Sequence, residues 1–347
     1  MTPRRSVLIT GAGGFLGVHL VRAMESWFEV IGAGRSARPS DLSCNWYLVD
    51  DSAGGMAEAV KTLRPDLVID AAFVNRKPES QRDGQYLASL ASPHLELFET
   101  CADLCIPLLL TSSSAVYGEG DVEQALHEAS PRRPVSLYGR AKTQQELQAE
   151  YVGRTAGLEA CIARLFNLLG PGRGLGTVVH DWISQIAPYQ TNEGPALLKV
   201  RTLDTSRDFV DPRDAARALA QMAKRLVRRQ CKPCEVFNVA SGRSVSLHEL
   251  KSLLESFSRV PIEVVESHPA PHSADVRTQR GDSSALQRSC GWQPRLDWQQ
   301  SVREVWDQFG KGTGIGGRFP VVCARGVGRG RRWPSNRAPR AADSLER

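Results

Sequence analysis

Apolar and polar residues alternate along the first 170 residues in a pattern typical of buried strands and amphipathic helices. Short apolar runs are each followed by a longer stretch in which apolar side chains recur at helical spacing. The predicted strands are residues 7–10, 29–33, 66–72, 106–114 and 158–167, and the predicted helices are residues 15–25, 53–63, 80–104 and 135–156. This order predicts an α/β fold of the Rossmann type, with a doubly wound parallel sheet covered by helices.

The pattern becomes less regular after Gly170. The predicted strands there are residues 197–201 and 235–239, and the predicted helices are residues 176–187, 212–228, 246–258 and 298–309. Such a mixed region suits a smaller α/β lobe that closes over a ligand. We expect the dinucleotide-binding domain to be residues 1–166 with about 208–238, and the substrate-binding lobe to be residues 167–207 and 239–311.

The net charge of +6 is confined to the end of the chain. Residues 312–347 contain eight arginines and two acidic residues, so residues 1–311 are formally neutral. A neutral body argues against a groove that follows nucleic acid. Because residues 312–347 are rich in Gly, Arg and Pro without periodicity, we expect a disordered basic tail.

The chain has no uninterrupted apolar run long enough to span a membrane, and we expect a cytoplasmic protein. Its eight cysteines are scattered, and Cys231 and Cys234 form a single CxxC without a second pair at zinc spacing. We therefore expect reduced thiols and no metal site.

A glycine-rich turn follows the first predicted strand and opens the first predicted helix. Gly11 permits the tight turn, Gly14 lets the backbone approach a pyrophosphate, and Gly17 lets the helix pack on the strand. The backbone N–H groups of Phe15 and Leu16 begin the helix, whose positive end favours a phosphate. The position of this turn between strand and helix predicts dinucleotide binding.

The end of the second strand bears on the choice between NADP(H) and NAD(H). An acidic residue there accepts a hydrogen bond from the ribose 2′-OH of NAD, whereas an arginine accommodates the 2′-phosphate of NADP. The chain has Arg35 at this point and no acidic residue before Asp41, which favours NADP(H) and leaves NAD(H) possible. Asp50 and Asp51, which end the next predicted strand, are candidates for contacts at the adenine edge.

Tyr138 and Lys142 lie four residues apart in a predicted helix and therefore face the same way. A neighbouring ammonium favours the phenolate, so we expect Lys142 to lower the pKa of Tyr138 into a working range. Lys142 can also donate to the nicotinamide ribose. Ser113 ends a predicted strand 25 residues before Tyr138, where its hydroxyl can bond a carbonyl or alkoxide oxygen. These three residues are the predicted catalytic groups.

Together these motifs resemble the extended short-chain dehydrogenase/reductases, the NAD-dependent epimerase/dehydratase family that acts on nucleotide sugars. The resemblance covers about residues 6–309. Within the family, the chain is most similar to the reductases of GDP-4-keto-6-deoxymannose. Its motifs are TGAGGFLG (10–17), TSSSAVYG (111–118), YGRAK (138–142), RLFNLLGPG (164–172), RDFVDPRD (207–214), VFNVASG (236–242) and GDSSAL…CGWQP (281–294).

The resemblance assigns roles to further residues. It implies that Ser112, Ala71 and Ala72 line the cofactor and that Ser113 is the acid–base partner of Tyr138. The substrate contacts that it implies are Ser113, Ser114, Asn167, Val178, Arg207 and His272, with Arg207 clamping the diphosphate. A homodimer through helices 80–104 and 135–156 is also implied, although Pro93 falls within the first of them.

The sequence departs from the family pattern at several places. Ser114 and Ala115 replace the Asp-Glu pair of the sugar 4,6-dehydratases, which argues against that class. His272 stands where a second diphosphate-binding arginine is usual. Leu90 and Pro93 replace the usual Asn and Gly, so a support for the active-site lysine or a water is missing, and the loop at 73–77 is unusual.

The expected function is that of an NADP(H)-dependent reductase of a 4-keto nucleotide-diphospho sugar. One alternative is a nucleotide-sugar 4-epimerase with tightly bound NAD, which consumes no external cofactor. A second alternative, from another class, is a non-catalytic protein that senses NAD(P). The presence of both Tyr138 and Lys142 favours an enzyme over a sensor.

Overall fold

The computed structural model describes residues 4–50, 54–73, 82–121, 123–174, 176–191, 194–231, 233–267 and 276–310. Asp51, His272 and the predicted tail at 312–347 lie outside the described residues. Of the loop at 73–77, Phe73 alone is described. None of the helices in the described ranges has the length and apolar character that a membrane span requires.

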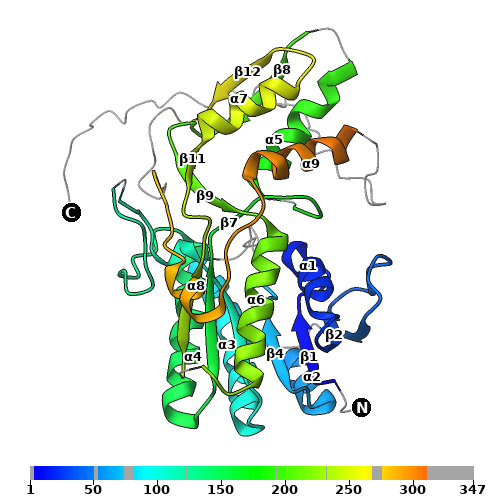
Figure 1. Cartoon of the computed structure of the whole chain (residues 1–347), viewed down its shortest axis with the longest axis vertical. Helices are drawn as coiled ribbons and strands as arrows, with labels where there is room; N and C mark the ends of the chain where they lie inside the picture. The colour runs from blue at the N-terminus through cyan, green and yellow to red at the C-terminus, as the bar shows by residue number, and fades with distance from the viewer. Residues whose placement is uncertain are drawn as a thin grey trace, which may run out of the picture.

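A seven-stranded sheet forms the base of the molecule (Figure 1). Its order is β10-β6-β5-β4-β1-β2-β3, and every neighbouring pair is parallel. The strands are β1 (Ser6–Thr10), β2 (Glu29–Gly34), β3 (Asn45–Leu48), β4 (Leu67–Asp70), β5 (Leu108–Ser113), β6 (Ala160–Leu165) and β10 (Glu235–Val239). The chain reverses its direction of travel between β1 and β4, which is where such sheets bind ligands. The predicted doubly wound Rossmann sheet is therefore confirmed.

Helices cover both faces of this sheet. One face packs against α1 (Phe15–Met24) and α6 (Pro212–Val227), and the other packs against α2 (Gly55–Leu63), α3 (Asp83–Asp103) and α4 (Leu137–Ala156). Central strands are buried on both faces, which is why they read as continuous apolar runs in the sequence. In β1, for example, Val7 and Ile9 belong to the first core and Leu8 to the second.

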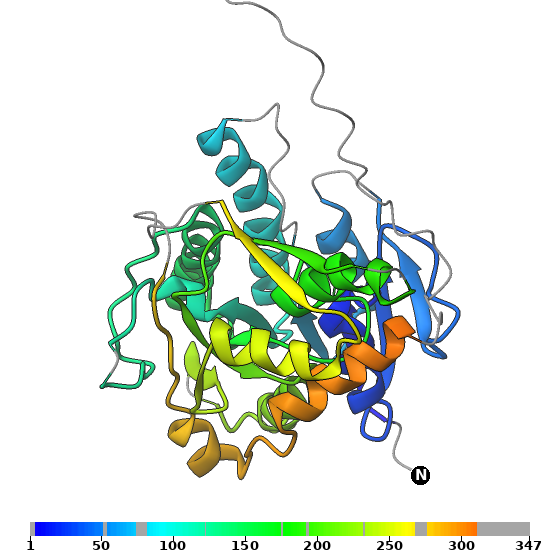
Figure 2. The same cartoon turned by 90° about the horizontal axis from the view of Figure 1, so that it is seen from above.

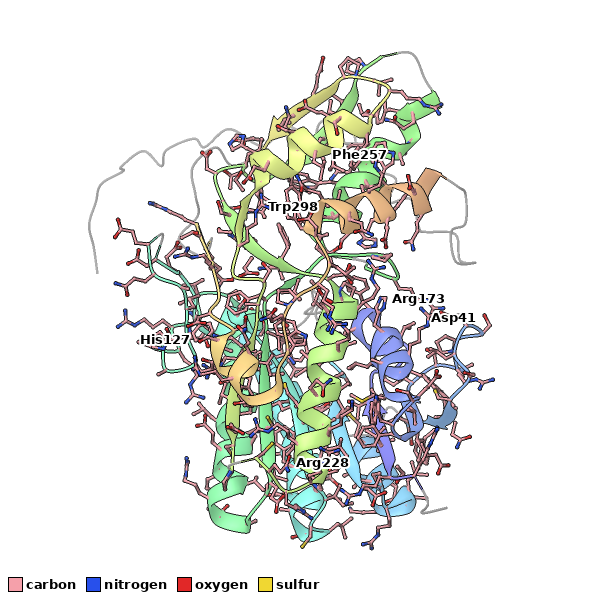
Figure 3. All side chains as sticks on the ribbon, in the orientation of Figure 1. Asp41, His127, Arg173, Arg228, Phe257 and Trp298 are labelled. Atoms are coloured by element: carbon pink, nitrogen blue, oxygen red, sulfur yellow. The ribbon has the colours of Figure 1, made fainter. Side chains whose placement is uncertain are left out.

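A smaller lobe lies beyond the carboxyl ends of the strands (Figure 1). It contains a three-stranded sheet of β11 (Ser244–Ser246), β9 (Ser206–Val210) and β7 (Asn167–Leu168), and a two-stranded sheet of β12 (Ile262–Glu266) and β8 (Ala196–Val200). Its helices are α5 (Val178–Ile186), α7 (Leu247–Phe257) and α9 (Trp298–Gly310). A separate apolar core joins these elements; Trp298 is buried in it and Phe257 packs against it, and both are labelled in Figure 3. Seen from above, α7 and α9 run side by side across the main sheet (Figure 2).

The structure adds elements that the sequence pattern does not predict. The predicted strand at 158–167 is divided: β6 ends at Leu165, and β7 begins at Asn167 in a different sheet. Strands β9, β11 and β12 and helix α8 (Ser284–Cys290) were not predicted, and β3 was expected only as a strand that ends near Asp50. Most of these elements are short or lie near the surface. Each therefore contains too few apolar residues for a strand or helix period to be detected.

Candidate active site

The glycine-rich turn lies at the carboxyl end of β1, against the backbone that follows β4. Gly11 has a φ of +65°, and a Cβ there would lie 2.9 Å from the carbonyl oxygen of Ala71 and 2.9 Å from the Cα of Ala72. A Cβ on Gly17 would collide with the carbonyl oxygen of Gly11. The hydroxyl of Thr10 accepts hydrogen bonds from the N–H groups of Ala71 (3.1 Å) and Ala72 (3.0 Å), which fixes this backbone.

The first turn of α1 fits the pyrophosphate of a dinucleotide. Gly14 is the N-cap residue and has no side chain to bond the free N–H groups of the helix. These N–H groups, at the positive end of the helix dipole, suit a phosphate group. Apart from its chain neighbours, a Cβ on Gly14 would approach the carbonyl oxygen of Gly11 at 3.1 Å and no other atom of the described residues within 4 Å. The predicted placement of Phe15 and Leu16 at the start of the helix agrees with this geometry.

The region expected to hold the adenosine lies at the ends of β2 and β3. Arg35 directly follows β2, Asp50 lies two residues beyond β3, and both residues are exposed. Sequence reasoning missed Trp46, whose indole packs over Gly32 and Gly34 and donates to the carbonyl oxygen of Ser36 at 3.0 Å. The sequence did contain a pattern that points to this contact, because two glycines on one face of a strand leave room for a large ring.

Ser113 and Tyr138 are brought together by a close approach of α4 to the end of β5. Tyr138 is hydrogen-bonded to Ser113, whose hydroxyl oxygen also accepts from the N–H of Ala115 at 3.2 Å. Helix α4 begins after Ser136, which caps it by accepting from the N–H of Gly139 at 3.0 Å. A Cβ on Gly139 would strike the carbonyl oxygen of Ala115, so the glycine of YGRAK allows this approach.

The prediction that Lys142 lowers the pKa of Tyr138 is wrong for this structure. Burial raises the pKa of Tyr138, the hydrogen bond with Ser113 lowers it in part, and the charge of Tyr86 raises it. Lys142 does not contribute, because its ammonium points elsewhere: Nζ donates to the carbonyl oxygen of Thr111 at 3.0 Å. The neutral phenol, a proton donor, is therefore the favoured form of Tyr138.

Phe73 lies in contact with both Tyr138 and Lys142. The centroid of its ring is 4.1 Å from Lys142 Nζ and 5.1 Å from the centroid of the Tyr138 ring, at an interplanar angle of 83°. It packs against a small apolar cluster formed by Tyr86, Leu90 and Ala141. Leu90, which replaces the Asn usual in the family, is thus part of the apolar wall of the site.

A buried carboxylate and histidine lie behind Lys142, and sequence reasoning missed both. Asp70 ends β4 and is 1% exposed, and His94 lies in α3 and is 4% exposed. Their side chains approach to 2.8 Å between Oδ2 and Nδ1, and Asp70 Oδ1 accepts from the hydroxyl of Thr10 at 2.8 Å. A charged residue at the end of the apolar run LVID was a signal, but nothing in the sequence identified its partner.

Two of the predicted serines already have internal partners. The hydroxyl of Ser112 donates to Glu146 at 2.5 Å, inside a network in which Arg164 also bonds that carboxylate. The hydroxyl of Ser114 donates to Gln279 Oε1 at 3.0 Å, and Gln279 Nε2 donates back to the carbonyl oxygen of Ser114. The cofactor contact of Ser112 and the substrate contact of Ser114 stay predictions.

The remaining predicted substrate residues come from the smaller lobe. Asn167 begins β7, and its amide Nδ2 is buried and has no hydrogen-bond partner among the residues that the structure describes, as a donor reserved for a ligand would be. Arg207 lies in β9 and donates to the carbonyl oxygen of Ser206 at 2.8 Å. Val178 is the first residue of α5 and packs on the core of the lobe.

Comparison with known families agrees with this geometry. The model of the NAD dependent epimerase/dehydratase family matches residues 7–240. The chain belongs to this family. The match includes the glycine-rich turn, Ser113, Tyr138 and Lys142, and the family resemblance drawn from the motifs is confirmed.

Two relatives from this family align with most of the chain. GDP-6-deoxy-D-mannose reductase of Pseudomonas aeruginosa is 28% identical, over 88% of this chain and 96% of its own. dTDP-6-deoxy-L-talose 4-dehydrogenase (NAD(P)(+)) of Kitasatospora kifunensis is 29% identical, over 86% of this chain and 94% of its own. The solved structure of RMD from Pseudomonas aeruginosa complexed with NADPH has a TM-score of 0.71 and 25% identity, and the match covers 88% of this chain and 99% of that chain.

Proposed function

We propose that this protein is an NAD(P)-dependent oxidoreductase of nucleotide-diphospho sugars that reduces a 4-keto group. The observation that carries the proposal is the hydrogen-bonded pair of Tyr138 and Ser113, with Lys142 one turn further along α4. These groups lie at the carboxyl edge of the sheet, as the glycine-rich turn does. The names of the two relatives, a 6-deoxy-sugar reductase and a 6-deoxy-sugar 4-dehydrogenase, support the same type of reaction.

Each residue of the site has a separate role in the proposed reduction of a carbonyl group. A bound nicotinamide cofactor supplies the hydride that reduces the keto carbon. Tyr138, kept neutral by its burial, donates its proton to the oxygen that gains charge. Ser113 donates a hydrogen bond to that oxygen, and Lys142 would donate to the ribose of the bound cofactor. In the oxidative direction the same groups act in reverse.

The second lobe contributes the groups that would hold the substrate. The unpartnered amide of Asn167 offers a donor to a sugar or phosphate oxygen. Arg207 would provide a forked guanidinium for the diphosphate. Ser114, Val178 and His272 complete the proposed substrate contacts, and NADP(H) is the proposed cofactor because of Arg35.

A nucleotide-sugar 4-epimerase is the second candidate function. The same acid–base pair can oxidise a sugar carbon and reduce it again from the opposite face. UDP-glucose 4-epimerase of Streptococcus mutans is 25% identical to this chain over 336 residues. The two functions differ in cofactor use, because a reductase consumes NADPH in proportion to product and an epimerase consumes none.

The test is a turnover assay with two types of substrate. GDP- and dTDP-4-keto-6-deoxyhexoses are supplied with NADPH, and UDP-glucose is supplied without added cofactor. We expect NADPH oxidation in the first assay, with Tyr138→Phe slower by about 10²–10⁴-fold. UDP-galactose from UDP-glucose without added cofactor would instead establish the epimerase. No turnover with either substrate, or full activity of Tyr138→Phe, would overturn the proposed mechanism.

We also propose a homodimer through α3 and α4. These helices pack against each other, and Leu147 and Tyr151 stand 48% and 55% exposed one turn apart on α4. Light scattering after size exclusion should give twice the chain mass of 38.0 kDa, and Leu147→Glu with Tyr151→Glu should give the monomer.

A further inference from the structure

Lys142 is a buried cation, and few negative charges are available to balance it. Lys142 is 3% exposed, and its burial lowers its pKa to about 8. Two carboxylates oppose this effect, Asp70 and then Glu146. Which of them balances the ammonium depends on how each is paired.

Glu146 is already balanced by arginines. Arg164 donates to it twice, from Nε at 2.9 Å and from Nη2 at 2.7 Å, and Arg132 Nη1 donates at 3.2 Å. Ser112 adds a fourth donor. A carboxylate shared by two guanidinium groups has little negative charge left for a third cation.

Asp70 has no guanidinium among the partners that the structure describes for it. One of its oxygens faces His94, and the other accepts from Thr10. Burial would raise the pKa of Asp70, but the charge and hydrogen bond of His94 and the charge of Lys142 hold it below its usual value. Cys101 stays neutral, because burial and then the charge of Asp70 raise its pKa to about 12.

Thr111 of β5 is hydrogen-bonded both to the backbone of Asp70 and to the ammonium of Lys142. Thr111 donates from its hydroxyl to the carbonyl oxygen of Asp70 at 2.9 Å, and its own carbonyl oxygen accepts from Lys142 Nζ at 3.0 Å. His94 comes from α3 and fixes the carboxylate on the side away from Thr10. Thr10 of β1 and His94 of α3 thus both bond the carboxylate at the end of β4.

We propose that Asp70, held in place by His94, is the counter-ion that keeps Lys142 protonated. Asp70 and His94 are therefore positioning residues, acting on the reaction through Lys142. The consequence for catalysis rests on the proposed function, whereas the charge coupling does not.

Direct titration of Lys142 in the protein without added cofactor tests the proposal. Lysine labelled with ¹³C at Cε gives a signal for Lys142, assigned by its loss in Lys142→Arg. In Asp70→Asn, which keeps the shape but removes the charge, we expect the midpoint of Lys142 to fall by at least one pH unit, a tenfold loss in proton affinity. NADPH affinity measured by fluorescence should then be about tenfold weaker at pH 9 and unchanged within twofold at pH 6.

Two control variants separate charge from packing. Glu150→Gln removes the same charge two turns further along α4, and Thr10→Val alters the surroundings of Asp70 without changing its charge. Both should keep the Lys142 midpoint within about a third of a pH unit of the wild type. A midpoint unmoved in Asp70→Asn, or moved as far in any control, would overturn the proposal.

A reciprocal measurement covers the case in which Asp70→Asn does not fold. Coupling between two groups is the same from either side. In Lys142→Met, the ¹³Cγ signal of Asp70 should therefore titrate at least one pH unit higher than in the wild type. An unchanged Asp70 titration would overturn the coupling, even if the turnover assays support the reductase.

Discussion

Phe73 offers a direct test of how the site admits its cofactor. If the proposed function is right, the nicotinamide ribose must reach both Tyr138 and Lys142, and the ring of Phe73 now touches both of them. The ring must then turn away before the cofactor binds. Phe73→Ala removes this requirement.

The size of the effect follows from the two contacts. A cation–π contact contributes about 0.5–2 kcal/mol depending on its desolvation, and an edge-to-face aromatic pair adds about 0.5–1.5 kcal/mol. Their sum is about 1–3.5 kcal/mol, and part of it is recovered when the displaced ring packs elsewhere. Since about 1.4 kcal/mol is tenfold in affinity, we expect Phe73→Ala to bind NADPH about tenfold more tightly.

The assay is a fluorescence titration of NADPH against wild type, Phe73→Ala and Leu87→Ala. Leu87 packs in the same apolar cluster, so its truncation controls for loosening of that cluster. The control should bind NADPH as the wild type does. Equal or weaker binding by Phe73→Ala would refute the argument, and weaker binding would mean that the ring supports the bound cofactor.

Three further predictions follow from single side chains. Arg35→Asp should weaken NADPH and strengthen NADH, because an acceptor for the 2′-OH replaces a partner of the 2′-phosphate; paired titrations with an unchanged ratio would remove the basis for an NADP(H) preference. Arg164→Met leaves the buried carboxylate of Glu146 without the two hydrogen bonds that Arg164 donates. The free energy of unfolding, measured in urea, should fall by about 3–5 kcal/mol. A fall of less than about 1 kcal/mol would contradict the role of the pair. Because the pKa of Lys142 is about 8, its ammonium is lost as the pH rises through that value, and kcat/KM for reduction should fall above it; a flat profile to pH 10 would contradict a role for the charged lysine.

The amino-acid sequence was sufficient for the frame of the molecule. Strand and helix periods are local, so the parallel sheet and most of its helices follow from the order of apolar residues. The glycine-rich turn could also be placed from the sequence. Each of its glycines avoids a clash, either with residues a few positions away or with the backbone after a neighbouring strand of the sheet. Tyr138 and Lys142 share a face because a helix repeats nearly every four residues.

The tertiary structure alone decided which charges meet. Asp70 and His94 lie 24 residues apart, on a strand and a helix whose relative placement no local period encodes. Lys142 points to Thr111 and the ring of Phe73, and not to Tyr138, so the expected lowering of the Tyr138 pKa gave way to the effect of burial. Protonation depends on desolvation and on the sum of nearby charges, and both are set by packing between distant segments. The sequence identifies the proposed catalytic groups, and the fold sets their charge.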